Sequence, residues 1–379
     1  MKGLLAWIIF ALASLTCLFW IGFGVRDDLR EDDVFHDIIQ ERIDLANNPG
    51  EELHVGVVGD WARHESILKG VTVAAEGINE DGGILGRKIV LDSQDDKGTV
   101  DGALGVAQVF ATNPEIAFVL GHTQLNLNAA VAQNYEFYGL LCLSPNIAGG
   151  SSGDNFSRHF ENGTPPYQIG GAILNLAKEK KWTRIGLLYE KSDHALRQAR
   201  RFESMANKHG IQMPLSFAYE GRGSGVAMHM ERWKRELGLD AIVLAVDDSD
   251  VIPLISACRV LEIDCPIIVL GERPAVTSSQ AEEMLGAMYF LEPYHGDAAF
   301  HDFSKRFRDK FTDAPNADAL LGYDSLLILA GAIRKADSFV PDAVAAALKD
   351  SPIEDSLSGS LRFDQKGSAI KRPPHFISY

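Results

Sequence analysis

The sequence predicts an α/β protein built from two doubly wound units, each with a parallel sheet, and three observations support this class. Short β-branched runs alternate with segments of helical period from His54 to the C-terminus. A polar, turn-rich stretch from Ser144 to Pro166 divides the alternation into two blocks. The length of 379 residues is sufficient for about two domains of ordinary size.

The composition excludes several classes of function. The chain carries 36 Lys and Arg against 52 Asp and Glu, a net charge of −16, so it offers no basic field to phosphates and nucleic acid is not expected as a partner. Four scattered cysteines form no C-x-x-C pair and predict neither a disulfide framework nor a zinc site. Cys258 and Cys265 lie seven residues apart, and this spacing leaves open whether they form a disulfide or stay two buried thiols.

The N-terminus predicts a membrane anchor. Gly3 to Val25 contains 23 residues without a charge, and a helix over this run would measure about 34 Å. The apolar run continues to Phe23, beyond the short apolar core of a cleaved signal peptide. We therefore predict an uncleaved signal anchor, a single transmembrane helix, over residues 1–25.

Residues 26–52 form an acidic juxtamembrane linker with three Arg and ten Asp or Glu. Lys2 on one side of the anchor and this acidic stretch on the other orient the chain N-in and C-out. The soluble part is thus expected at the cytoplasmic membrane, facing the periplasm or the cell exterior. Apolar residues at helical spacing predict a short juxtamembrane helix, either a lone surface helix or a stalk that pairs with another chain: Val34, Phe35, Ile38, Ile39 and Ile43.

The first block alternates strictly. Its helix from Glu65 to Glu80 has one apolar face and ends at Asp81-Gly82-Gly83, where glycine supplies a helix end. The other expected elements, in order, are strands His54 to Gly59 and Lys88 to Ser93, helix Thr99 to Ala111, strand Ile116 to Leu120, helix Asn126 to Tyr138 and strand Leu140 to Leu143.

The second block repeats this pattern and closes with a more helical region. The expected helices are Tyr167 to Lys180, Ala195 to His209, Met228 to Leu237, Val251 to Leu261, Ala298 to Phe311, Ala317 to Ala336 and Pro341 to Leu348. The expected strands are Arg184 to Tyr189, Met213 to Ala218, Ala241 to Val246, Ile267 to Leu270, Gly286 to Leu291, Ser358 to Phe363 and His375 to Tyr379.

No motif indicates catalysis, a cofactor or a metal. The glycines from Gly82 to Gly86 follow a helix and precede a strand, the wrong order for a phosphate loop. The histidines lack metal-ligand spacing and the serine-rich loops lack a nucleophile-elbow context, so we expect a protein that is not an enzyme. Asp95 and Asp96 follow a strand, where they either bind a donor or a cation or cap a helix and face solvent.

Several motifs, in order, resemble the leucine/isoleucine/valine-binding protein family, the type I periplasmic binding proteins that serve as ABC transporter substrate-binding proteins. They span about residues 53 to 379. The motifs are Val55 to Gly59, Gly70 to Glu80, Gly82 to Ile89, Asp95 to Lys97, Phe118 to His122, Leu143 to Pro145, Gly322 to Asp324 and Leu361 to Gly367.

The resemblance implies two α/β lobes that close on a small ligand about a hinge of three crossovers. On this basis we expect residues 53–165 plus 292–340 in the first lobe and 166–291 plus 341–379 in the second. In open parallel sheets, ligands bind at the carboxyl ends of strands, where helix N-termini offer N–H groups to an anion.

Seven residues are the expected ligand-binding positions. Thr123, Gln124 and Asn146 stand in strand-to-helix turns, and Trp61 and Arg63 occupy the short first-lobe loop that we expect over Asp60 to Lys69. By resemblance, His194 replaces the family's second-lobe Tyr and Glu272 is the acid that meets an α-ammonium.

The sequence departs from the family pattern at two hydroxyl positions, which are Leu125 and Ala148 here. Thr123, a backbone N–H or Arg63 can substitute as the partner of a ligand carboxylate, and guanidinium binds carboxylate strongly. The alternative for Trp61 and Arg63 is that they only cover the surface of the lobe. The expected function is thus an anchored importer subunit for a branched-chain amino acid, another amino acid or an amide, with a permease and an ATPase as partners. The alternative is a sensor or docking adaptor for a membrane partner that has lost the usual amino-acid site.

Overall fold

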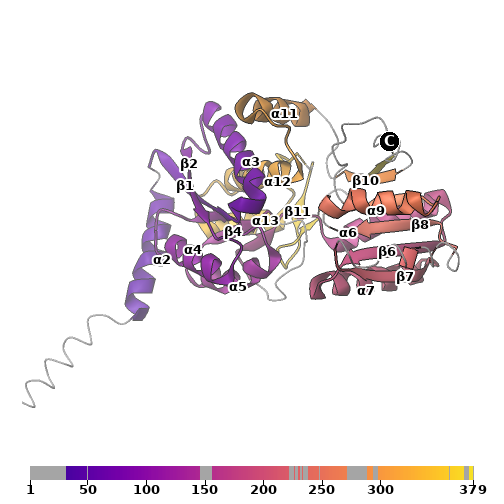
Figure 1. Ribbon diagram of the computed structural model, residues 1–379. Helices are drawn as coiled ribbons and strands as arrows, with labels where there is room; N and C mark the ends of the chain where they lie inside the picture. Colours follow the sequence, from indigo (N-terminus) through magenta and orange to yellow (C-terminus); the bar gives the residue numbers. More distant parts are fainter. Residues whose placement is uncertain are drawn as a thin grey trace, which may run out of the picture.

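The computed structural model contains two separate parallel sheets, each covered by helices (Figure 1). It describes residues 31–48, 50–145, 156–221, 226, 229–230, 233, 238–246, 248–270, 288–292, 298–357, 359–370 and 375–378. The apolar run over residues 3–25 lies outside these ranges. Of the helices that are described, none has both the length and the apolar character needed to cross a membrane.

The first sheet has five parallel strands in the order β2-β1-β3-β4-β5. Its central strands are fully buried because helices cover both faces. The strands are β1 (Glu52–Gly59), β2 (Lys88–Asp95), β3 (Phe118–Leu120), β4 (Leu141–Ser144) and β5 (His159–Glu161), and the connecting helices are α3 (Trp61–Glu80), α4 (Val100–Ala111) and α5 (Leu125–Phe137).

The second sheet has six strands in the order β13-β10-β9-β8-β6-β7, and only β13 runs antiparallel to its neighbour. The strands are β6 (Arg184–Glu190), β7 (Gln212–Tyr219), β8 (Ala241–Ala245), β9 (Ile267–Val269), β10 (Met288–Glu292) and β13 (His375–Ser378). Helices α6 (Pro166–Lys180) and α7 (Asp193–Lys208) contribute to one apolar cluster, and α9 (Asp248–Val260) contributes to another.

The C-terminal region returns to the first lobe, and the structure corrects the expected division there. Helices α11 (Ala298–Phe311), α12 (Ala317–Ala336) and α13 (Pro341–Asp350) precede the hairpin β11 (Arg362–Phe363) and β12 (Ala369–Ile370). Residues 341–370 were expected in the second lobe. Val344, Leu348 and Phe363 are instead buried in the core of the first sheet, and only β13 joins the second. An amphipathic helix buries its apolar face wherever a sheet face is available, which the sequence does not reveal.

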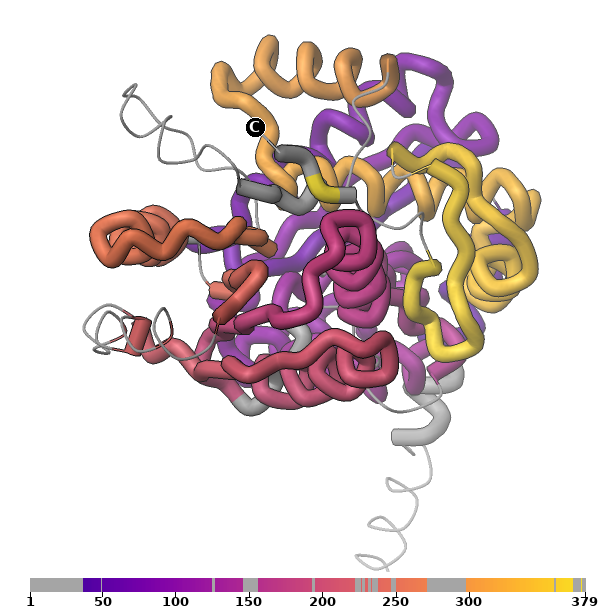
Figure 2. The backbone as a smooth tube through the Cα atoms, turned by 90° about the vertical axis from the view of Figure 1, so that its right-hand side faces the viewer, coloured from indigo at the N-terminus to yellow at the C-terminus, as the bar shows by residue number. Residues whose placement is uncertain are grey.

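Two glycines allow helices α3 and α12, which are far apart in the sequence, to cross in close contact. A Cβ on Gly70 of α3 would lie 1.9 Å from the Ala319 carbonyl oxygen, and one on Gly322 of α12 would lie 2.2 Å from that of Ile67. Each helix therefore needs a glycine where the other crosses it. Figure 2 shows the result, with the orange C-terminal helices beside the indigo N-terminal ones.

The acidic linker forms a helix, α2 (Glu31–Asn47), that packs onto the first lobe through a buried arginine. The Arg42 guanidinium donates to four main-chain carbonyls, at 2.7 Å to Ile116, 2.5 Å to Tyr138, 2.8 Å to Ala111 and 3.1 Å to Asn113. Burial lowers the pKa of Arg42 to about 10, which still leaves it charged at neutral pH. The linker helix is thus a docked part of the lobe.

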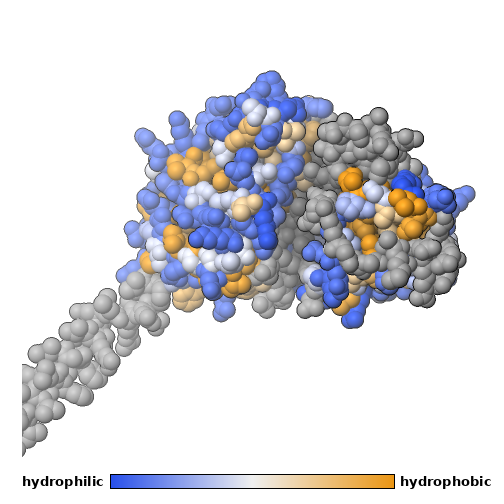
Figure 3. Space-filling model, viewed as in Figure 1, coloured by the Kyte–Doolittle hydropathy of each residue, from blue (hydrophilic) through white to orange (hydrophobic). Residues whose placement is uncertain are grey.

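The chain passes between the lobes three times. It leaves the first sheet after β5, returns after β10 to α11, which packs on α3, and leaves again after β12 to β13. The visible face of the first lobe in Figure 3 is mainly hydrophilic, with apolar residues scattered over it, as on an ordinary solvated surface. Cys142, Cys258 and Cys265 are free thiols.

Candidate functional site

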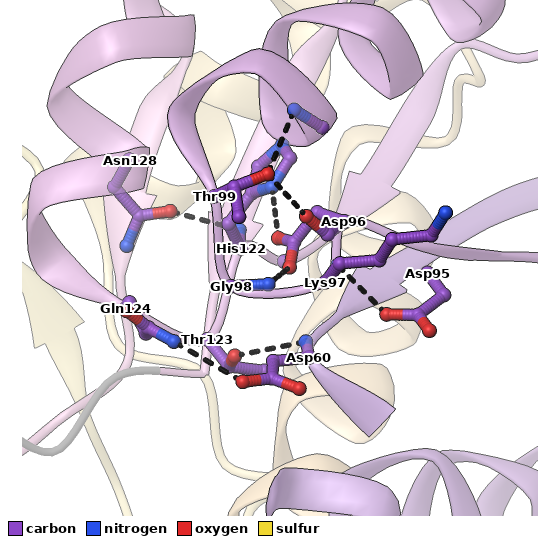
Figure 4. A network of polar contacts seen from close by, with 12 residues as sticks. Asp60, Asp95, Asp96, Lys97, Gly98, Thr99, His122, Thr123, Gln124 and Asn128 are labelled. Atoms are coloured by element: carbon purple, nitrogen blue, oxygen red, sulfur yellow. Dashed lines mark hydrogen bonds and ion pairs between the residues drawn. The ribbon is translucent and has the colours of Figure 1, made fainter. Parts of the chain in front are cut away.

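Polar side chains gather where the strands of the first sheet end (Figure 4). The turns after β1 and β3 contribute Asp60 and the segment His122-Thr123-Gln124, and Asp95 ends β2 and is followed by Asp96. Because these strands are parallel and adjacent, their carboxyl ends meet at one edge of the sheet. The same edge carries the first turns of α3, α4 and α5.

Two of these three helices begin without a side-chain cap. Thr99 caps α4 by accepting from the Gly102 N–H, but neither Asp60 at the start of α3 nor Gln124 at the start of α5 makes such a bond. The first N–H groups of a helix have no partner inside it and carry a partial positive charge. The start of α5 can therefore bind an anion such as a carboxylate.

The carboxylate of Asp60 lies beside this helix start. Its side chain is 7% exposed. Oδ2 lies 3.5 Å from Gln124 Nε2 and 3.7 Å from Arg63 Nε, while the Asp60 N–H points at the Thr123 hydroxyl oxygen at 3.4 Å. A buried negative charge and an uncapped helix start thus stand side by side, and this pair complements a molecule with both an ammonium and a carboxylate.

The structure brings four of the expected binding residues to this edge. Thr123 is buried, Gln124 is half-buried, and Trp61, the first residue of α3, packs on the core of the first lobe. The Arg63 side chain is 73% exposed, with Nε 3.7 Å from Asp60 Oδ2. The expected loop Asp60 to Lys69 is helical from Trp61 onward, with one non-helical residue, His64, because Asp60 already starts the helix.

The other three expected residues are not described in full. Asn146 and Glu272 lie outside the residues that the structure describes, as does Ala148. The backbone of His194 lies in the first turn of α7, near the end of β6, but its side chain is not described. Leu125 is the first residue of α5, so the lost hydroxyl position is the helix start itself.

A buried chain of polar groups supports this edge from beneath. His122 Nδ1 lies 2.6 Å from Asp96 Oδ2, and Nε2 lies 3.0 Å from the Tyr135 hydroxyl. Burial raises the pKa of Tyr135 well above its usual value, so the hydroxyl stays protonated. Asp96 also accepts from the Gly98 N–H at 2.9 Å. Of the alternatives for the acidic pair, Asp95 faces solvent, whereas Asp96 binds a donor inside the lobe.

Asn128 fixes the turn that carries Thr123. Its Oδ1 accepts from the His122 N–H at 2.8 Å, and the Ser144 hydroxyl lies 2.8 Å from the same oxygen and 2.7 Å from the Gly121 carbonyl oxygen. Gly121 has a φ of 145°, and a Cβ there would lie 2.2 Å from the Val58 carbonyl oxygen. The turn is therefore held rigidly before any ligand arrives.

Sequence reasoning did not select Asp60 or His122. Asp60 is adjacent to a strand end and precedes Trp61, which is a signal for an N-cap but not for a binding group. His122 stands in the same strand-to-helix turn as Thr123 and Gln124, but only those two were selected from it. Among the described residues, no group of three or more His, Cys, Asp or Glu could hold a metal ion.

Two open sheets joined by three crossings, with a polar site at the carboxyl edge of one of them, define a two-lobed binding protein. The family model described as "Periplasmic binding protein" matches residues 56–375. A "Leu/Ile/Val-binding protein homolog 1" of Brucella abortus (strain 2308) is 25% identical over 333 residues, 83% of this chain and 84% of its own length. An "Amino acid binding protein" of Pseudomonas aeruginosa is 25% identical over 317 residues, 80% and 82% of the two chains.

Solved structures agree with this assignment. An ABC transporter substrate-binding protein from Desulfitobacterium hafniense, solved in complex with Leu, matches with a TM-score of 0.73 and 26% identity over 87% of this chain and 100% of its own. The chain therefore belongs to the type I periplasmic binding proteins, in the Leu/Ile/Val-binding family of ABC transporter substrate-binding proteins. This is a family of binding proteins and not of enzymes.

Proposed function

We propose that this chain binds a small amino acid, in the first instance a branched-chain one, or an amide, and delivers it to an ABC-type importer. The observation that carries the proposal is the edge of the first sheet, where the uncapped start of α5 stands beside the Asp60 carboxylate. The Leu complex of the Desulfitobacterium hafniense relative supports the same class of ligand. A permease and an ATPase subunit are the expected partners.

The ligand contacts fall on both lobes. Under this proposal Trp61, Thr123 and Gln124 contact the ligand from the first lobe, and Arg63 pairs with its carboxylate. We propose Asn146 as a further contact from the first lobe, and His194 and Glu272 as contacts from the second lobe; Asn146, Glu272 and the His194 side chain lie outside the part of the chain that the structure describes. If Arg63→Ala leaves the affinity for L-leucine unchanged, Arg63 has no part in the site.

A thermal-shift screen of the full chain tests the proposal. Amino acids, amides, small acids and sugars are added at increasing concentration, and a ligand at about 100 times its dissociation constant adds about 2.7 kcal/mol to stability. For a protein of this size the melting temperature then rises by several degrees. Aliphatic amino acids are expected to give the shift. A cooperative melt that none of them moves contradicts the proposal.

We also propose that residues 3–25 anchor the protein in the cytoplasmic membrane with the lobes on the extracytoplasmic side. The uncharged run and the acidic linker after it support this topology. The protein is expected in the membrane fraction and in solution only with detergent, and deletion of residues 3–25 is expected to release it. Release of the intact chain by a salt wash alone would contradict the anchor.

One observation favours a second function, a ligand sensor or a docking adaptor for a membrane partner. Leu125 stands where the family has a ligand-binding hydroxyl, so this site has lost one usual contact. Purification of the full chain from its own membranes distinguishes the two functions. A permease with its ATPase supports import, and a receptor or kinase that copurifies in their place supports sensing.

A further inference from the structure

We propose that the Asp60 carboxylate is the first-lobe partner of the ligand's ammonium group, which makes Asp60 a determinant of specificity for amino acids over the matching carboxylic acids. This inference rests on the proposed function, since it names the group that binds the ammonium end of the same ligand. It assigns a role to a residue that neither the sequence pattern nor the resemblance selects.

The first argument is the environment of the carboxylate. Asp60 is 7% exposed at its side chain, so its charge has lost most of its contact with water. Its contacts to Gln124 Nε2 at 3.5 Å and Arg63 Nε at 3.7 Å are longer than the 2.7–2.9 Å of charge-assisted hydrogen bonds. The other oxygen, Oδ1, has no hydrogen bond within the described part of the chain, and Figure 4 draws none to it.

The second argument is that the Asp60 carboxylate does not cap the helix that Asp60 begins. Asp is among the preferred N-cap residues because its side chain usually accepts from the N–H groups of the first helical turn. Asp60 is the N-cap of α3 but makes no such bond. Its Oδ2 instead lies beside Gly98, where a Cβ would come within 2.6 Å of it. The lack of a side chain at Gly98 thus leaves room for the carboxylate beside Gln124, the N-cap of α5.

The third argument is the spacing of the two charges that the site offers. The ammonium nitrogen and the carboxylate carbon of an α-amino acid share one carbon and lie about 2.5 Å apart. Gln124 is the N-cap of α5, and its amide contacts Asp60. A carboxylate at the start of α5 therefore brings the ammonium group to Asp60. The cation now nearest, Arg63, is 73% exposed and can be displaced at little cost.

The test compares L-leucine with 4-methylpentanoate, which lacks only the ammonium group, by calorimetric titration of the full chain. The wild type is expected to bind L-leucine at least about 30-fold more tightly, because an unpaired buried charge is costly. Asp60→Asn is expected to lose at least about 30-fold in affinity for L-leucine and none for 4-methylpentanoate. Asp95→Asn removes an exposed carboxylate at the same edge and is expected to change neither affinity.

The outcomes separate the two levels of the proposal. Equal loss of both probes in Asp60→Asn, or no loss of either, overturns the role of Asp60 while leaving the proposed function intact. A wild type that binds neither probe contradicts the proposed function itself. Melting curves confirm that each variant is folded, and Asp60→Ser repeats the comparison with a second side chain that carries no charge.

Discussion

At the scale of single residues, His64 on α3 and Asp318 on α12 form an ion pair. His64 Nδ1 lies 2.8 Å from Asp318 Oδ2, and this bond raises the pKa of His64 above its ordinary value. A histidine with a raised pKa in the folded state stabilises the protein below its unfolded pKa. That stabilisation is lost as the pH rises through the folded pKa.

We predict that Asp318→Asn lowers the melting temperature more at about pH 5.5 than at about pH 9, on either side of the ordinary histidine pKa. Asp313, an exposed carboxylate after α11, provides the control Asp313→Asn, for which the two values should agree. A loss for Asp318→Asn that does not depend on pH would show that His64 is not charged in the pair.

His159 on β5 has the opposite behaviour. Burial lowers the pKa of His159 to about 4, with a further contribution from His122. Within the described residues, neither ring nitrogen has a hydrogen-bond partner. Because the unfolded chain takes up a proton near its ordinary pKa and the folded chain does not, stability falls as the pH drops between the two values.

We predict that His159→Leu removes this loss. Relative to wild type, its free energy of unfolding should gain up to about 1.4 kcal/mol per pH unit between about pH 6.5 and about pH 4. Urea denaturation at several pH values measures this difference in the free energy of unfolding. His301→Leu, at an exposed position on α11, is the control. A wild type and His159→Leu with parallel pH profiles would refute the assignment.

At the scale of secondary-structure elements, the packing of helix α2 onto the first lobe depends on Arg42. Arg42 is 1% exposed and bonds the carbonyls at the end of α4, before β3 and after α5. We predict that Arg42→Met destabilises the protein by at least about 3 kcal/mol, because several buried carbonyls lose a charged donor. Glu41→Met, at the exposed neighbouring position, should change stability by less than about 0.5 kcal/mol. Denaturation curves of equal midpoint for the two variants would contradict this role.

Long periodic elements could be predicted from the sequence, and short ones could not. Helices α11 and α12 have the bounds that their apolar periodicity predicts. Strand β5 was expected as part of a polar loop, and β12 was not expected at all. Strand β5 pairs with β4, and its Glu161 N–H donates to the distant Gly367 carbonyl at 2.8 Å, whereas β12 is a two-residue strand in a hairpin with β11. Local pattern carries no information about such partners.

The same limit applies to the site. Thr123 and Gln124 could be selected because they follow a strand and precede a helix. Asp60 and His122 acquire their roles only through the neighbours that tertiary structure gives them, Gln124 for one and Asp96 for the other. The docking of α2 was missed for the same reason, since an arginine in an acidic helix predicts a solvated side chain.

At the scale of the whole molecule, three crossings join the lobes, and the described polar site lies at the carboxyl edge of the first sheet. Closure of such lobes is a hinge motion about the crossing segments. One crossing lies between β5 and α6, a second between β10 and α11, and the third between β12 and β13. Closure would bring the carboxyl edge of the second sheet toward Asp60 and Thr123.

Two introduced fluorophores make this motion measurable, because Cys142 and Cys258 are buried and Cys265 is half-buried. Burial raises the pKa of Cys142 and Cys258 to about 12 and that of Cys265 to about 11, so these residues should not react with a thiol-directed dye in the folded protein. Cys17→Ser removes the remaining cysteine. New cysteines at Lys97 and Lys191, which are exposed near the ends of β2 and β6, then accept one fluorophore each.

Energy transfer between these two labels during a titration with L-leucine tests the central claim most directly. Our account predicts a saturable rise in transfer as the two lobes close on the ligand. A control pair at Lys97 and Asp313, both on the first lobe, should show no change. Transfer that stays constant at concentrations where calorimetry shows full occupancy, or a protein that never binds the amino acid, would contradict the account.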